Sequence, residues 1–575
     1  MTHSRKAVEF HGLIQHSFAL RIQGDRRPYH GMDPSKALIE LFKLPATGGA
    51  EFQVHSVNQF LKHEPPNPSR KPFDLPSYSP LVKNRLTTLV PQEIPFLQPD
   101  AAGALPKPLR WAEAEKDKEK DKEKEKEKEK DERWERFIFA QDGQGDEDSP
   151  RFNDFLVETT QPHACECEAH AVSRVLCQLL AHRRSMLFGL SLAGRFFNVM
   201  LPHAFLKAEN RTPPRDWILQ PLVSLIQAGG DGSGFQRTFS LTFFLIPVSA
   251  DCADRKMSVE EIKSAFQAEW NLASSRSPKE LASFSVSGPL LGYISRLDPS
   301  VLPSLLPPAN GHRPLRQTAE AILFAVALRI AQGSEDRADK QLRQRIGDDV
   351  VTSLSNSRVS SLLAVDPKLT EKASKRTDKG PLFPGSLKQL MRATAGEDRI
   401  AQRKRYRIDR PFYDPGDCAI AVLPTNRCII CTTAGYQQRG SYTSGLMQAG
   451  WLAYMAIGAS VAISTMRSIY RDLERVELSE PSAIARIERE VAVDLDEIYD
   501  LDITWEAYRH RYRLLRDRLG ITSDYEALHG KLQAFYRETE ARFEAKTQRR
   551  LMVLTAAIVV LSLLILAGTI VLGVK

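Results

Sequence analysis

The sequence predicts an α+β cytoplasmic domain followed by a helical stalk and one C-terminal transmembrane helix. Three observations predict this fold class. In the middle of the chain, runs rich in β-branched and aromatic residues alternate with segments of helical periodicity. Amphipathic helical patterns then follow one another through residues 440–550. Finally, the 24 residues from Leu551 to Val574 carry no charge, and at about 1.5 Å per residue such a helix crosses a hydrocarbon core of roughly 30 Å.

The chain begins with two segments of low expected order. Residues 1–112 are punctuated by prolines, as in HEPPNPSRKPFDLPSYSP, a composition that argues against long helices and central strands, so we expect a partly ordered N-terminal region. In residues 113–133 lysines alternate with acidic residues. This alternation places like charges four apart and opposite charges three apart, so the helix-favouring and helix-disfavouring pairs cancel. The segment therefore reads as a solvated low-complexity linker.

Residues 134–366 have the sequence pattern of an α+β domain. The runs WILQPLVSLIQ and FQRTFSLTFFLIPV flank AGGDGSG, which predicts a β-hairpin. The pattern PLRQTAEAILFAVALRIAQ predicts a helix that ends before Gly333. Residues 411–439, with DCAIAVLPTNRCIICTTAG, predict a second hairpin that completes the domain.

A basic segment, residues 367–410, interrupts the domain and is expected to be partly disordered. From Lys368 to Arg410 it has 13 basic and 5 acidic residues, a surplus that equals the net charge of +8 of the whole chain. Basic residues interleaved with aromatic ones suit an anionic lipid surface, whereas a solvated linker is the simpler interpretation. The candidate lipid-binding residues are Arg403, Lys404, Arg405 and Arg407.

The predicted stalk, residues 440–550, opens with an uncharged run of 27 residues from Gly440 to Met466. This run is long enough to span a membrane, but it is built largely of alanine, glycine and serine, so a buried helix is favoured over a second span. Further on, Ser523 and Glu526 form a capping-box pattern. We expect one helix of about 50 residues to run from Ser523 through the membrane.

Heptad spacing in the stalk predicts self-association. Leu528, Leu532 and Phe535 follow the spacing of a coiled-coil seam, and confinement in a bilayer raises the effective concentration of the chains. We therefore expect a homo-oligomer that uses these three residues.

The flanks of the apolar C-terminal run indicate its orientation. Arg542, Lys546, Arg549 and Arg550 precede the run and only Lys575 follows it, so the positive-inside rule places the N-terminal mass in the cytoplasm. Seven cysteines in a chain without a predicted secretory signal also fit a reducing compartment. The lipid bilayer is accordingly the first expected partner.

The C-terminal part resembles a known family in its layout. An apolar helix, the acidic run DLDEIYDLDI, a basic helix ending in RLG, a long helix, QRR and a terminal span follow in order over residues 440–575. This order resembles the stalk of CorA-type magnesium transporters and their single-spanning relatives. The resemblance implies a helical stalk joined to an α/β cytoplasmic domain, with self-association. The chain lacks the Gly-Met-Asn signature of these transporters and a second adjacent span, so no ion-binding residue is implied.

One short segment carries candidate zinc ligands. HACECEAH places His163, Cys165, Cys167 and His170 within eight residues, and all four are ligand types for zinc. The C-x-C spacing differs from the usual C-x₂₋₄-C clip, so buried thiols and surface histidines are the simpler interpretation. Cys428 and Cys431 lie three apart in a predicted strand and would point to opposite faces.

The motif content argues for a binding protein rather than an enzyme. We find no G-x-S-x-G, P-loop, H-E-x-x-H or kinase motif set in the sequence. We therefore expect a non-enzymatic, tail-anchored membrane protein whose cytoplasmic domain senses a signal or binds a protein partner, with no specific nucleic acid. A CorA-like channel or transporter subunit and a membrane-tethered hydrolase are the alternatives.

Overall fold

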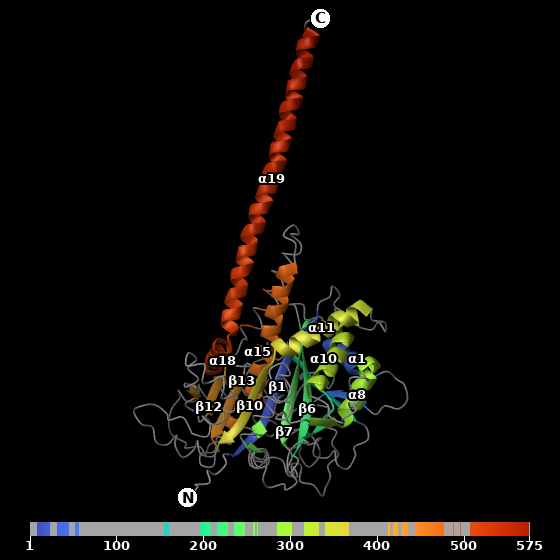
Figure 1. Ribbon diagram of the computed structural model, residues 1–575, viewed down its shortest axis with the longest axis vertical. Helices are drawn as coiled ribbons and strands as arrows, with labels where there is room; N and C mark the ends of the chain where they lie inside the picture. Colours follow the sequence, from blue (N-terminus) through green and yellow to red (C-terminus); the bar gives the residue numbers. More distant parts are fainter. Residues whose placement is uncertain are drawn as a thin grey trace, which may run out of the picture.

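The computed structural model describes one large sheet, the helices that pack on it and a long C-terminal helix (Figure 1). The charged linker 113–133 and the basic segment 367–410 lie outside the described residues. The described residues are 9–22, 32–44, 52–56, 154–159, 196–208, 215–227, 235–247, 257–258, 261–262, 284–301, 315–332, 340–366, 412–414, 418–423, 428–434, 443–475, 487, 491, 495, 499 and 506–573.

The described strands form a single mixed sheet of 13 strands. Its main path runs β11-β12-β13-β10-β1-β7-β6-β4-β3-β2, while β5 pairs with β6 and β9, and β8 pairs with β1. The pairs β3/β4 and β10/β13 are parallel. The strands are β1 (Glu9–Arg21), β2 (Phe52–Ser56), β3 (Asp154–Thr159), β4 (Phe196–Met200), β5 (Ala204–Ala208), β6 (Arg215–Gln227), β7 (Phe235–Pro247), β8 (Met257–Ser258), β9 (Phe284–Ser287), β10 (Val359–Asp366), β11 (Phe412–Asp414), β12 (Cys418–Leu423) and β13 (Cys428–Ala434).

Strand β1 comes first in the chain yet lies in the middle of the sheet. It pairs antiparallel with β7 on one side and with β10 on the other, so that Ile14 lies opposite both Leu245 and Leu362. The expectation that residues 1–112 hold no central strand is therefore wrong for residues 9–21. That stretch contains no proline, and prolines were the reason for the expectation.

Both predicted hairpins are present. β6 and β7 pair antiparallel along nearly their whole length, with Leu219 opposite Leu245 and Val223 opposite Leu241. β12 and β13 pair antiparallel in the same way, with Cys418 opposite Thr433. The predicted helix before Gly333 is α10 (Leu315–Gln332). Glycine and proline residues in the sequence therefore predicted the two hairpin turns and the end of α10 correctly.

One face of the sheet carries the main apolar core. Alternate residues of its central strands, such as Phe18, Phe243 and Val223, are fully buried and belong to one buried cluster. The helices in that cluster are α1 (Pro34–Phe42), α8 (Pro289–Leu297), α10 and α11 (Lys340–Asn356).

The opposite face of the sheet is polar and is covered by α15 (Thr443–Arg475), which packs along β1, β7, β10 and β13. Strand alternation turns Gln15 and Ser17 toward this face, where Ser17 Oγ lies 2.9 Å from Thr242 Oγ1. Met455–Met466 of α15 is buried against the sheet. The prediction of a buried helix rather than a second span is therefore confirmed for residues 455–466, where small residues allow close contact with a polar strand surface, whereas the side chains of residues 440–454 lie outside the described part of the chain.

The long predicted helix is present as α19 (Ile521–Gly573), a continuous helix of 53 residues. It follows α18 (Glu506–Leu519) after Gly520, which adopts a φ of 75°. The predicted capping box at Ser523 is wrong, because the helix already begins at Ile521 and Ser523 lies inside its first turn. A left-handed glycine makes the sharp junction instead.

Candidate functional site: an apolar helix end and the base that holds it

The apolar end of α19 has no protein cover. Its large apolar side chains from Leu551 to Ile570 are between 52% and 70% exposed, and α19 projects away from the body so that the C-terminus lies at its far end (Figure 1). Within the described part of the chain, this is the one helix long and apolar enough to cross a membrane, with a mean hydropathy of 2.8 over its most apolar window. An apolar surface of this extent requires lipid or another protein to cover it.

The two threonines within this apolar end are compatible with a hydrocarbon environment. Thr555 Oγ1 donates to the carbonyl of Leu551 at 2.8 Å, and Thr569 Oγ1 donates to the carbonyl of Ile565 at 3.0 Å. Each hydroxyl is therefore satisfied by its own helix. In lipid this matters, because an unsatisfied polar group costs several kcal/mol there.

The first turns of α19 form a base that is packed into the body. Ile521 and Leu528 are 0% exposed and Leu532 is 5% exposed. The helix contacts both α15 and α18 over this stretch. Because α15 also lines the sheet, the base of α19 connects the apolar helix end to the centre of the fold.

Aromatic and cationic side chains reinforce the base. The ring of Tyr499 stacks on that of Tyr525 with 3.8 Å between centroids, and the guanidinium of Arg516 lies 3.9 Å from the Tyr499 centroid. Arg516 Nη1 also donates to the carbonyl of Tyr499. On α15, the ring of Tyr470 faces the ammonium of Lys531 at 4.5 Å. These contacts join α18, α19 and α15 by stacking and cation–π attraction.

Buried charge accompanies this packing. Burial lowers the pKa of Arg467 on α15, against the opposing effect of Asp524 on α19. Burial also raises the pKa of Tyr470, and the Asp524 carboxylate raises it further. The Asp524 carboxylate acts on the pKa of both residues, so α15 and the first turn of α19 approach closely enough for their charges to interact.

Beyond the base, α19 carries the half-buried residues Phe535, Tyr536 and Thr539 and then becomes exposed on all sides. Residues 540–550 are exposed, including Phe543 at 66%. Arg542 pairs with Glu538 one turn earlier at 2.7 Å, an i,i+4 contact that supports an isolated helix by a few tenths of a kcal/mol. This exposed stretch separates the base from the apolar end.

The structure gives two of the predicted oligomerisation residues an intramolecular role. Leu528 and Leu532 are buried within the single chain, which leaves them no surface for a second copy, whereas Phe535 is partly buried. On the same helix face Arg542 and Lys546 follow at heptad spacing, so a parallel pair joined on this face would bring like charges together. We therefore do not assign these leucines to an intermolecular seam.

The other predicted site residues lie outside the described residues. These include the candidate zinc ligands His163, Cys165, Cys167 and His170 and the candidate lipid-binding residues Arg403, Lys404, Arg405 and Arg407. Cys428 and Cys431 lie on β13, opposite Leu423 and Ile420 respectively. Among the residues that the structure describes, no three His, Cys, Asp or Glu side chains are grouped so as to hold a metal ion.

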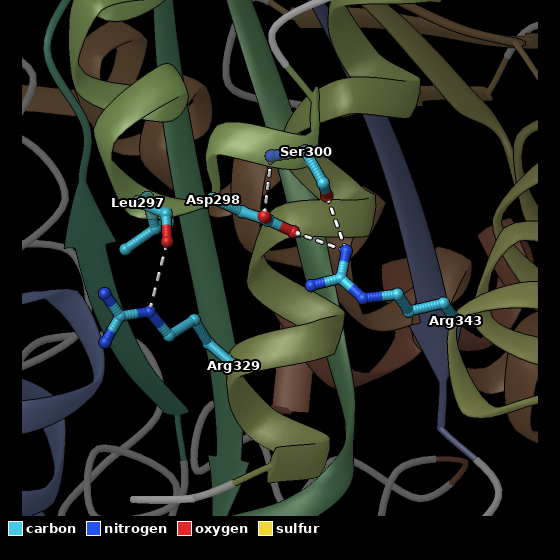
Figure 2. Close-up of polar contacts among 5 residues, drawn as sticks. All are labelled: Leu297, Asp298, Ser300, Arg329 and Arg343. Atoms are coloured by element: carbon cyan, nitrogen blue, oxygen red, sulfur yellow. Dashed lines mark hydrogen bonds and ion pairs between the residues drawn. The ribbon is translucent and has the colours of Figure 1, made fainter. Parts of the chain in front are cut away.

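A separate polar cluster lies where α8 ends (Figure 2), and Figure 1 places α8 away from α19. The Asp298 carboxylate accepts the backbone N–H of Ser300 at 2.9 Å and pairs with Arg343 of α11 at 3.6 Å. Arg343 Nη1 donates to Ser300 Oγ at 2.6 Å, and Arg329 Nε of α10 donates to the Leu297 carbonyl at 3.4 Å. These contacts join the end of α8 to α10 and α11, so their role is structural.

One histidine–serine pair is also structural. His16 Nδ1 lies 2.8 Å from Ser360 Oγ, a distance suited to activating a hydroxyl. Both residues are 0% exposed and sit on adjacent central strands. A substrate cannot reach a pair enclosed in this way, so the contact fixes the register of β1 and β10.

The apolar end of α19 and its base therefore form the candidate functional site. The chain matches no family model, no curated protein and no solved structure. The basis for a function is consequently the geometry of α19 itself.

Proposed function

We propose that this chain is a single-pass membrane protein in which Leu551–Val574 spans the bilayer and the sheet-containing body lies in the cytoplasm. The observation that carries the proposal is the apolar end of α19, whose large side chains are more than half exposed. The run contains 15 leucine, isoleucine and valine residues. At about 0.3–0.6 kcal/mol each on an insertion scale, they favour the membrane by roughly 5–9 kcal/mol.

The cytoplasmic placement of the body rests on charge. Arg542, Lys546, Arg549 and Arg550 lie within the last turns before the apolar run, and α19 carries them without a break into that run. Basic residues next to a span favour the cytoplasmic side, where anionic lipids also attract them.

In this proposal the body is a binding or sensing module rather than an enzyme. Support comes from the direct connection of the span to α15 through Leu528, Leu532 and the Tyr470–Lys531 contact. Binding of a protein partner at the sheet or its helices would thereby be held at a membrane surface. Self-association in the bilayer belongs to the proposal as well, and it is restricted to residues beyond Phe535, where α19 is largely exposed.

Deletion of residues 551–575 tests this function. The full-length protein should float with lipid vesicles and resist extraction at alkaline pH, whereas the truncated protein should remain soluble. A matched control replaces residues 551–574 with an unrelated leucine–alanine helix of equal length and should restore flotation. Resistance of the truncated protein to extraction would contradict the proposal, as would a soluble full-length protein.

A further inference from the structure

The exposed stretch of α19 between its base and its apolar end has a defined length. Leu532 is the last buried residue of α19, and Phe535, Tyr536 and Thr539 are still half-buried. Leu551 begins the apolar run 12 residues after Thr539, so at a rise of about 1.5 Å per residue the exposed stretch measures roughly 18 Å. In Figure 1 no described helix or strand lies beside the upper part of α19.

The sequence makes this stretch stiff. From Lys531 to Ala567 there is no glycine or proline, the residues that most often allow a helix to bend. Gly530, a residue at which the helix could bend, lies between Leu528 and Leu532. Both leucines are buried, so the packing of the base restrains the helix there. The Glu538–Arg542 pair and the threonines at 539 and 547, which bond back to the carbonyls of Phe535 and Phe543, lie within the same regular helix.

The base also fixes the direction in which α19 leaves the body. Three independent contacts hold it: the buried apolar side chains, the Tyr499–Tyr525 stack and the Lys531–Tyr470 contact. They lie on α15, on α18 and next to α18, so they hold one side of α19 at several points along its length rather than at a single point. A helix held in this way cannot pivot at its root without breaking aromatic and apolar contacts.

We infer that α19 is a rigid strut that holds the folded body at a set height above the bilayer, not a flexible tether. This inference rests on the proposed membrane anchoring. A membrane helix tilted by about 20° would keep roughly 17 Å of the exposed stretch along the membrane normal. Because the headgroup layer takes up about 5–8 Å of that height, roughly 10 Å of aqueous space separates the body from the lipid.

The strut has a direct consequence for binding. The side of the body that faces the membrane stays open to water, so a cytoplasmic partner can approach it there without displacing lipid. The basic juxtamembrane residues Lys546, Arg549 and Arg550 lie at the lipid end of the strut and contact the headgroups in place of the body.

The height of the body above the membrane tests the strut. The full chain, reconstituted in vesicles of phosphatidylcholine and phosphatidylserine, carries a donor fluorophore on a noncanonical amino acid at Val351, which is 48% exposed. Energy transfer to a headgroup-labelled lipid reports the height. Duplication of residues 538–544 should raise the body by about 10 Å, and deletion of the same seven residues should lower it by about 10 Å.

A replacement of residues 538–544 by seven glycine and serine residues is the control for stiffness. It should broaden the distance distribution and lower its mean. Equal distances in the duplication, the deletion and the original chain would overturn the strut. A distance that grows only at high salt would overturn it too, since the body would then rest on anionic lipid through charge. All variants keep residues 551–575, so a failure to float with vesicles would contradict the anchoring instead.

Discussion

The ring of Tyr499 lies flat against the ring of Tyr525, with 3.8 Å between centroids and 6° between planes. The Arg516 guanidinium lies over the same Tyr499 ring at 3.9 Å, so Tyr499 is held between a cation from α18 and an aromatic side chain from α19. This arrangement joins the two helices on either side of Gly520. Through this contact, α18 should hold the base of α19, and with it the apolar helix end, in position.

Removal of the Tyr499 ring should loosen the base of α19. The Tyr499→Ala variant loses both the stacking and the cation–π contact, and we expect it to lower the free energy of unfolding by about 1–3 kcal/mol. Hydrogen exchange of the amides from Ile521 to Leu532 should accelerate. Tyr499→Phe keeps the ring and should stay within about 0.5 kcal/mol of the original chain. Equal exchange rates in both variants would show that the stack does not hold α19.

Leu528 should behave as a core residue and not as a contact between chains. The Leu528→Ala variant should lose about 2–5 kcal/mol of unfolding free energy, since the side chain is fully buried. Chemical crosslinking of the protein in membranes should be unchanged under conditions where it stays folded. Phe543→Ala, at a position 66% exposed, is the matched control and should change stability by less than about 0.5 kcal/mol. Loss of crosslinking without loss of stability would restore the seam hypothesis.

The contact between α15 and the sheet should tolerate a smaller side chain but not a larger one. Ser460 is 0% exposed, and its hydroxyl has no hydrogen-bond partner within the described structure. Ser460→Ala should therefore be neutral or slightly stabilising. Ser460→Leu should destabilise by about 1–3 kcal/mol, because the larger, branched side chain has no space in a close helix–sheet contact. Thermal unfolding of the pair checks this, and a neutral Leu variant would mean that α15 lies farther from the sheet.

The ion pair between Arg471 of α15 and Asp349 of α11 links the helices of the two sheet faces. The atoms lie 2.8 Å apart, and the Asp349 side chain is only 10% exposed. A double-mutant cycle with alanine at both positions should give a coupling of about 1–2 kcal/mol. The same cycle at the exposed pair Glu538–Arg542 should give less than about 0.5 kcal/mol. Couplings of equal size would contradict the role assigned to the partly buried pair.

Local sequence signals predicted the elements whose contacts are close in the chain. The glycines between residues 227 and 235 marked the β6–β7 hairpin, and the absence of breakers after Lys531 predicted the unbroken α19. The small residues of α15 predicted burial because they suit close packing better than lipid contact. In each of these elements, the residues of a turn or the periodicity of a helix determine the structure that forms.

The remaining features depend on partners distant in sequence. β1 is central only because β10, more than 300 residues later, supplies its second neighbour. The heptad spacing at Leu528 and Leu532 does not reveal whether the buried partner is another chain or α15 and α18 of the same chain. The interleaved RHRYRLLRDR of α18 was a signal for cation–π contacts. Its partner Tyr499 lies outside α18, and periodicity does not reveal that pairing.

If Leu551–Val574 crosses a bilayer, as we propose, each of its residues must lie at a defined depth in lipid. Nitroxide labels on noncanonical amino acids, placed one at a time from residue 545 to residue 573 in the vesicle-bound full chain, report their exposure to oxygen and to a water-soluble nickel complex. Oxygen contact should peak near Ser562, nickel contact should be lowest there, and both trends should reverse toward Ala545. Uniform nickel contact along the whole helix would contradict the membrane span.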